Sequence, residues 1–99
     1  MVHVVWEFLV PAVRLPEFER SYSGVDGSWA QLFRKSPGFR GTVLLRAPED
    51  PRHFLTIDSW DTLDAQVAMR EQFQDEYSDL DQACEELTET ERRVGVFED

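Results

Sequence analysis

The hydrophobic period of this 99-residue chain switches repeatedly between two and about 3.6 residues, and the order of these switches restricts the fold more than any other feature. Segments rich in β-branched and aromatic residues predict strands, and segments with apolar residues three or four apart predict helices. In chain order, we expect a strand at Val2–Val10, a broken helix at 15–35, strands at Phe39–Arg46 and Arg52–Trp60, a helix at 65–87, and a strand at Arg92–Glu98.

The two helical regions differ in their continuity. Gly24 and Gly27 interrupt the first, and Ser28 followed by Gln31 predicts a capping box that restarts it. We expect Asp61 to be the N-cap of the second. One apolar stripe runs along this second helix, with a bend expected near Tyr77: Ala65, Met69, Phe73, Tyr77, Leu80, Cys84 and Leu87.

The order strand-helix-strand-strand-helix-strand defines the fold class. It is typical of α+β proteins of the ferredoxin-like type, in which a four-stranded antiparallel sheet carries its helices on one face. The first and third strands then lie side by side in the centre. Because the chain is short and has no linker or repeat, we expect one domain over residues 1–99.

Helices can cover only one face of such a sheet. Alternating residues of the first strand give a strongly apolar face, and we expect the other face of the sheet to be mixed. The mixed face still carries apolar side chains, namely Val5, Leu9, Leu44, Phe54 and Trp60. An uncovered apolar patch of this size predicts a homodimer with two-fold symmetry that buries the remaining face.

The net charge of −10 argues against two classes of partner. Residues 1–70 carry nine acids and eight bases, whereas residues 71–99 carry eleven acids and two bases, Arg92 and Arg93. Without a basic stripe, we expect no binding to nucleic acid or to anionic membranes. We interpret the acidic segment as a solvated helix face.

The cysteine content and the N-terminal segment indicate the compartment. The single cysteine, Cys84, can form no intrachain disulfide and lies on the apolar stripe, so we expect a small core residue. The first ten residues lack a basic region and are too few to span a bilayer. These features predict a cytoplasmic protein.

The two histidines do not predict a metal site. His3 begins the first strand and His53 begins the third, and in an antiparallel pair these ends lie roughly 15–20 Å apart. No metal-binding or phosphate-binding motif occurs, and no serine lies in a nucleophile-elbow motif. We therefore expect neither a metal nor a hydrolytic triad.

A small-molecule site is predicted at the exit of the third strand. Thr56, Asp58 and Trp60 share one face of this strand, and three aromatic residues of the helices can close over them, namely Tyr22, Phe73 and Tyr77. Aromatic walls around a few polar groups are typical of ligand pockets. The alternatives at this point are that Trp60 is plain core, that Asp58 caps the next helix, and that Tyr77 packs with its hydroxyl in water.

Several segments resemble the antibiotic biosynthesis monooxygenase family. Trp29-Ala30-Gln31-Leu32-Phe33 followed by Pro37-Gly38-Phe39-Arg40-Gly41-Thr42 is similar to the first helix and second strand of that family. Phe54-Leu55-Thr56-Ile57-Asp58-Ser59-Trp60 with Ala65 resembles its third strand and second helix, and Val94-Gly95-Val96-Phe97 its last strand.

This resemblance implies a dimeric α+β barrel with a cavity in each subunit, and an oxygenase that uses neither metal nor flavin. The substrate implied is a small aromatic or quinol-like molecule whose own carbanion reduces dioxygen. In this reading Trp60 forms the cavity wall, and Asp58 is a desolvated base or a hydrogen-bond partner. Tyr22, Thr56, Phe73 and Tyr77 contact the substrate.

Two departures from the family pattern bear on the chemistry. Family members that tailor polyketides have an asparagine where this chain has Thr56, and a hydroxyl cannot reproduce an amide. The haem-degrading members use an asparagine, a tryptophan and a histidine, of which only Trp60 has a counterpart, so haem degradation is disfavoured. A non-catalytic binding or stress-response barrel and an acid–base isomerase are the alternatives to an oxygenase.

Overall fold

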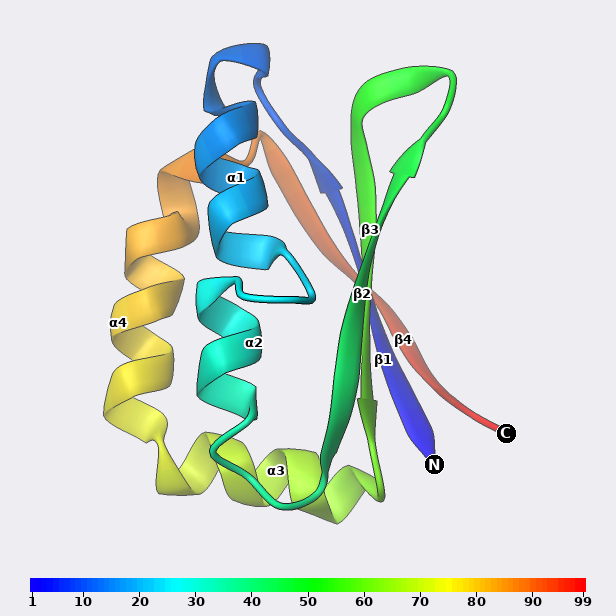
Figure 1. Cartoon of the computed structure of the whole chain (residues 1–99), viewed down its shortest axis with the longest axis vertical. Coiled ribbons are helices and arrows are strands. Elements are labelled where there is room, and N and C mark those ends of the chain that lie inside the picture. Colours follow the sequence, from blue (N-terminus) through cyan, green and yellow to red (C-terminus); the bar gives the residue numbers. More distant parts are fainter.

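A computed structural model describes all 99 residues as a sheet with helices on one face (Figure 1). The elements are β1 (Val2–Leu9), α1 (Leu15–Tyr22), α2 (Ser28–Phe33), β2 (Phe39–Ala47), β3 (Asp50–Trp60), α3 (Leu63–Gln72), α4 (Gln74–Cys84) and β4 (Thr90–Glu98). Short 3-10 helices occur at Ala12–Arg14 and Glu85–Leu87. The strand order β2-β3-β1-β4, with all pairs antiparallel, confirms the predicted ferredoxin-like topology.

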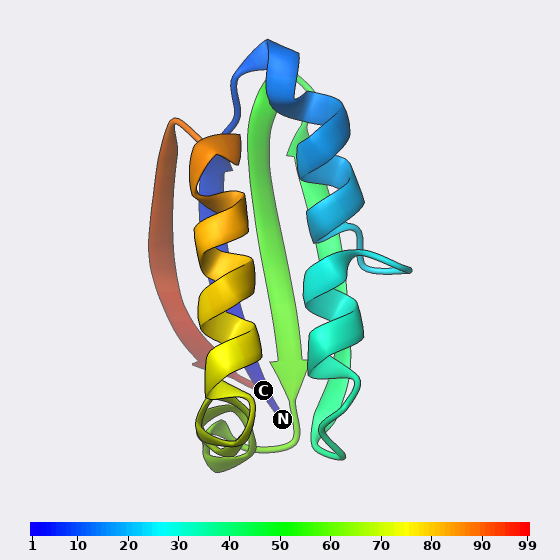
Figure 2. The ribbon, with the colours of Figure 1, turned by 90° about the vertical axis from the view of Figure 1, so that its left-hand side faces the viewer.

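The helices form one layer over the sheet. Helices α1 and α2 follow each other along one side of this layer, and α4 runs beside them (Figure 2). Helix α3 instead lies across one end of the sheet (Figure 1). None of the helices combines the length and the apolar character needed to cross a membrane.

The second helical region is not one helix. The backbone breaks at Phe73, whose φ of −111° and ψ of 36° separate α3 from α4. The expected bend near Tyr77 is therefore wrong by about one helical turn. Because the break falls between two members of the apolar stripe, it turns the chain without exposing the stripe.

Two predicted helix caps are also wrong. Gly27, not Ser28, is the N-cap of α2, and the Gln31 amide donates to the carbonyl oxygen of Asp26 instead of closing a capping box. At the start of α3 the Thr62 hydroxyl accepts from the backbone N–H of Ala65 at 3.1 Å. Asp61 pairs with Arg40 instead.

The register of the central strands determines which side chains share a face. In β3 the buried residues alternate, and the opposite residues of β1 are Val4 for Asp58 and Val2 for Trp60. The apolar face of β1 is thus the same face as Trp60, and the helices cover it. The predicted grouping of Val5 with Trp60 is wrong, because Val5 pairs with Ile57 on the outer face.

The core fills the space between this face and the helices. It is rich in aromatic contacts: the rings of Phe18 and Tyr22 stack at 4.4 Å, and Phe8 meets both edge-on. A second group, nearer α3, joins Phe33 to Trp60 at 5.3 Å. These two groups leave a less densely filled region between them and α4.

An irregularity in β4 sets the orientation of its charged residues. The β1–β4 register shifts between Val5 and Trp6, where Gly95 has a φ of 157° that favours glycine. Beyond the shift, Trp6 pairs with Arg93 and Phe8 pairs with Glu91. Arg93 and Glu91 therefore lie on the helix-covered face, under α4.

Candidate functional site

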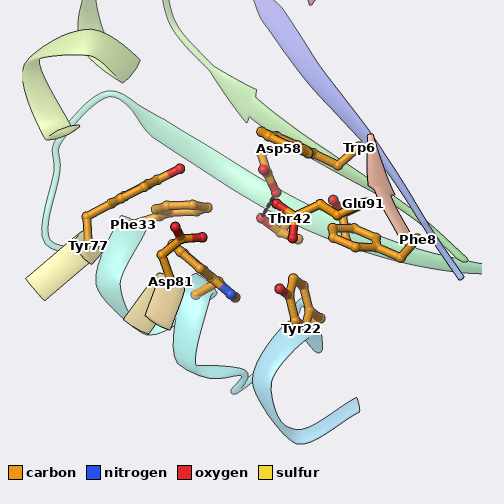
Figure 3. A pocket seen from close by; sticks show the side chains of 11 residues that line it. Trp6, Phe8, Tyr22, Phe33, Thr42, Asp58, Tyr77, Asp81 and Glu91 are labelled. Atoms are coloured by element: carbon orange, nitrogen blue, oxygen red, sulfur yellow. Dashed lines mark hydrogen bonds between the residues drawn. The ribbon is translucent and has the colours of Figure 1, made fainter. Parts of the chain in front are cut away.

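A cavity lies between the helix-covered face of the sheet and helices α2 and α4. It has an inner part of about 50 Å³ and an outer part of about 240 Å³. Both parts are lined by Trp6, Phe33, Asp58, Tyr77, Asp81 and Glu91. The inner part, shown in Figure 3, adds Phe8, Tyr22, Trp29, Thr42 and Thr56, and the outer part adds Val4, Trp60, Gln66, Arg70 and Arg93.

Asp58 is the buried charged group of this cavity. Its position in the middle of β3 leaves it 9% exposed, between Val4 on β1 and Thr42 on β2. The Thr42 hydroxyl donates to Oδ1 of Asp58 at 2.8 Å (Figure 3), while Oδ2 has no hydrogen-bond partner. Burial raises the pKa of Asp58 to about 6, and the hydrogen bond from Thr42 opposes this shift. Asp58 does not cap the following helix.

Trp60 is both a core residue and part of the cavity wall. It is 1% exposed, and its ring contacts Phe33 and Phe39 at 5.3 and 5.1 Å. It also lines the outer part of the cavity. Thr56, one pleat pair away on β3, is buried and lines the inner part, where its hydroxyl makes no hydrogen bond. The two predicted residues are thus brought to the same cavity as Asp58.

Tyr22 and Tyr77 come from opposite sides of the helical layer. Tyr22, on α1, and Tyr77, on α4, both direct their hydroxyls toward the space that Asp58 lines (Figure 3). Burial raises the pKa of both hydroxyls, and the guanidinium of Arg70 opposes the shift at Tyr77, whose ring centre lies 4.8 Å away. At the cavity pH range relevant to Asp58, both hydroxyls remain hydrogen-bond donors.

The back of the inner part holds a cluster of weakly polar groups. The indole N–H of Trp29 is buried next to the Tyr22 hydroxyl and the Cys84 thiol, and it acts to lower the pKa of each without meeting the geometry of a hydrogen bond. Burial outweighs this effect and raises the pKa of Cys84. A thiol held neutral in this way packs as a small core residue.

Phe73 does not reach the cavity. It lies at the break between α3 and α4, and the ammonium group of Lys35 stands 5.6 Å from its ring centre. Neither part of the cavity is lined by this residue. The stripe on which the prediction rested continues through the break, but the change of helix direction moves Phe73 away from the sheet.

Several cavity residues were not expected from the sequence. Trp6 is signalled by the alternation of β1, which places it on the apolar face. Thr42 depends on the β2–β3 register, and Glu91 and Arg93 depend on the shift in β4. Asp81 lies one turn after Tyr77 on α4, a spacing that places both on one helix face. The acidic residues of this cavity do not gather into a metal-binding group.

The fold and the cavity define a ferredoxin-like α+β protein with an aromatic-walled internal site. The sequence model of the antibiotic biosynthesis monooxygenase family matches residues 1–72, nearly three quarters of the chain. The protein belongs to this family. No curated protein matches the sequence.

Solved structures with this fold include SnoaB from Streptomyces nogalater, a cofactor-independent oxygenase. The two chains are 26% identical, with 99% of this chain and 91% of SnoaB covered and a TM-score of 0.74. A protein from Deinococcus radiodurans, whose name places it in the same family, is 18% identical over 100% of this chain and 92% of its own, with a TM-score of 0.79. A conserved protein from Methanosarcina mazei is 13% identical over 97% and 89%, with a TM-score of 0.75. The last two likenesses show the fold alone.

Proposed function

We propose that this protein is a cytoplasmic monooxygenase that needs no cofactor and acts on a small aromatic, quinol-type substrate. The observation that carries the proposal is the carboxylate of Asp58, which is buried in an aromatic-walled cavity with one oxygen free. Membership of the antibiotic biosynthesis monooxygenase family and the likeness to SnoaB support the reaction class.

Asp58 is suited to act as a general base. With a pKa of about 6, it is largely ionised at pH 7 and is still a stronger base than an exposed carboxylate. The hydrogen bond from Thr42 fixes Oδ1, so that Oδ2 is the atom that accepts a proton from the substrate. Thr42 is therefore a positioning residue for the base.

The groups around Asp58 are suited to stabilise the anion that proton removal creates. Arg70 and Arg93 line the outer part of the cavity, and neither forms a salt bridge within the chain. Their positive charge favours an ionised oxygen of the substrate, and the aromatic walls exclude water from it. The hydroxyl of Thr56 offers one further donor from the inner part.

The size of the cavity favours one aromatic ring. A cavity of about 150 Å³ is enough to hold benzene, and sites for drug-sized ligands begin near 300 Å³. The outer part, at about 240 Å³, lies between these limits. A substituted single ring fits this space, whereas a polycyclic substrate requires the walls to move.

The reaction can be written with its atoms and electrons balanced. Oδ2 of Asp58 takes a proton from an activated C–H or O–H group, and the resulting carbanion or phenolate resonance form donates its electrons to dioxygen. A C–O bond forms, giving a peroxide, which loses one water molecule as the carbon becomes a carbonyl. One oxygen atom of dioxygen enters the product and the other leaves in water.

Oxygen uptake by the purified, metal-free protein with an anthrone and a panel of hydroquinones tests this proposal. We expect uptake above the uncatalysed rate, rising with pH around a midpoint near 6, because the ionised form of Asp58 is the active one. Asp58→Asn should remove this enhancement, because an amide oxygen cannot accept the proton.

A second variant separates the cavity wall from the core. Trp60→Ala removes both, whereas Trp60→Phe keeps an aromatic residue in the core and shortens the wall of the outer part. We expect Trp60→Phe to weaken substrate binding while the protein stays folded. Ligand that binds without turnover would contradict the oxygenase and favour a non-catalytic binding protein; unchanged affinity would show that Trp60 is core alone.

We also propose that the outer face of the sheet binds a second copy of the chain. No helix covers this face (Figure 2), and Val43, Leu45 and Phe97 on it are 51%, 46% and 54% exposed. Light scattering at micromolar concentration should give a dimer, and Leu45→Glu should give a monomer. A monomeric wild-type protein would contradict the proposal.

A further inference from the structure

The inner part of the cavity is charged in one sense only. Three carboxylates line it, from Asp58, Asp81 and Glu91, and no basic side chain does. The arginines of the cavity, Arg70 and Arg93, line the outer part alone. A ligand that fills both parts therefore meets negative charge at its inner end and positive charge at its outer end.

These carboxylates have no internal counter-ion. None of the three forms a salt bridge, although other acids of the chain, such as Glu7 and Glu89, pair with arginine. Burial and then the negative charge of Asp81 raise the pKa of Glu91, so the two face each other closely enough to repel. A cation between them would remove this repulsion.

Asp58 provides a second and independent indication of a ligand. It is nine-tenths buried, and its Oδ2 faces the inner part without a hydrogen-bond partner (Figure 3). A buried acceptor of this kind is normally satisfied by a donor. A ligand that donates hydrogen bonds would meet this requirement where the protein does not.

The walls of the inner part suit a cation as well. They consist of six aromatic residues, namely Trp6, Phe8, Tyr22, Trp29, Phe33 and Tyr77. The faces of such rings attract ammonium groups, and cages of aromatic and acidic residues recognise them in many proteins. The volume of about 50 Å³ holds an amino group with a short alkyl arm but not a ring.

The charge of the surrounding segment favours the same ligand. Asp81 on α4 and Glu91 on β4 belong to residues 71–99, whose net charge is −9. Such a field raises the local concentration of cations and repels anions. Charge, size and wall chemistry therefore agree.

We infer that the inner part of the cavity binds a protonated amino group, and that the substrate is a one-ring quinol carrying a short aminoalkyl arm. The inference rests on the proposed function for the placement of the ring in the outer part, beside Arg70 and Arg93. The ammonium group then lies among Asp58, Asp81 and Glu91.

Binding of three matched catechols under anaerobic conditions tests the inference without requiring turnover. The probes are dopamine, its neutral analogue 4-(2-hydroxyethyl)catechol and the anion 3,4-dihydroxyphenylacetate, with affinities measured by calorimetry at pH 7.5. We expect dopamine to bind about tenfold or more tightly than the neutral analogue, as for a desolvated ammonium in an aromatic cage. The anion should bind most weakly.

Two double variants with the same change in net charge separate local contact from the general field. Asp81→Asn with Glu91→Gln should abolish the preference for dopamine, whereas Glu71→Gln with Asp79→Asn, on exposed positions of α3 and α4, should preserve it. Equal binding of dopamine and the neutral analogue, tighter binding of the anion, or a preference that survives the first double variant would overturn the inference. Absence of oxygen uptake alone would contradict the proposed function but not this binding preference.

Discussion

The two pairs of helices over the sheet differ in how they use their side chains. Helices α1 and α2, with fourteen residues, bury six of them: Phe18, Tyr22, Trp29, Ala30, Leu32 and Phe33. Helices α3 and α4, with twenty-one residues, bury only Met69 and Cys84. The first pair therefore holds the fold together, whereas the second pair forms one wall of the cavity and carries most of its acids. Stability and ligand recognition are assigned to different helices.

The largest effect expected from this difference is on Phe18. It is fully buried and contacts Phe8, Tyr22 and Phe54, so Phe18→Ala should lower the free energy of unfolding by about 3–5 kcal/mol. Phe73→Ala, at the half-buried break of the second pair, should cost about half as much or less. Urea unfolding measures both, and equal losses would contradict the comparison.

The next effect is on Asp58, where function and stability conflict. Its pKa is near 6 in the folded protein and near 3.8 when unfolded, so the folded state holds the proton more tightly. The related stability is fully present below pH 3.8 and is lost as the pH rises to 6 and above. Asp58→Asn should thus stabilise the protein by about 2–3 kcal/mol at pH 8.

The pH dependence provides the control for that prediction. The gain from Asp58→Asn should disappear below about pH 4, where both states of the wild-type protein carry the proton. Urea unfolding at pH 8 and pH 3.5 makes the comparison. A gain that is the same at both pH values would mean that a packing change, and not the buried charge, is responsible.

A smaller effect is expected at Thr42. Thr42→Val removes the hydroxyl that donates to Asp58, so the pKa of Asp58 should rise and the pH midpoint of oxygen uptake should move upward. The loss for the ionised form should be about 1.5–3 kcal/mol, as for other hydrogen bonds to charged groups. Thr42→Ser keeps the donor and should keep the midpoint; if both variants shift it equally, the hydroxyl has no part in it.

The smallest effect is expected on the exposed side of the second pair. Asp79 lies on α4, makes no salt bridge and does not line the cavity. Asp79→Asn should change the free energy of unfolding by less than about 0.5 kcal/mol and leave ligand affinity unchanged. Thermal unfolding and calorimetry check this, and a larger change would mean that the acidic surface of α4 is more than a solvated face.

The order of the elements could be predicted from the sequence because hydrophobic periodicity is a local property. The glycines at 24 and 27 marked the break between α1 and α2 correctly. No such residue marks the break at Phe73, where the stripe spacing of four continues unchanged. The caps also failed, because a hydroxyl or carboxylate near a helix start can be used elsewhere, as Asp61 is by Arg40.

The candidate site was predictable only as far as a single strand reaches. Alternation along β3 placed Thr56, Asp58 and Trp60 together, and the helix stripe added Tyr77 correctly and Phe73 wrongly. The remaining groups depend on which residues lie opposite each other in neighbouring strands. Thr42 and Glu91 meet the cavity through register, and register is decided by packing across the whole sheet rather than by local sequence.

The register shift in β4 offers an evolutionary route to new substrates. Counting back from Val96 without the shift, Arg92 would face the helices in place of Glu91 and Arg93. Deletion of a single residue near Gly95 would thus replace an acid of the cavity by a base, while every helix and every aromatic wall kept its sequence. Relatives that share this fold can in this way diverge in the charge of the molecules they accept through one short insertion or deletion in the last strand.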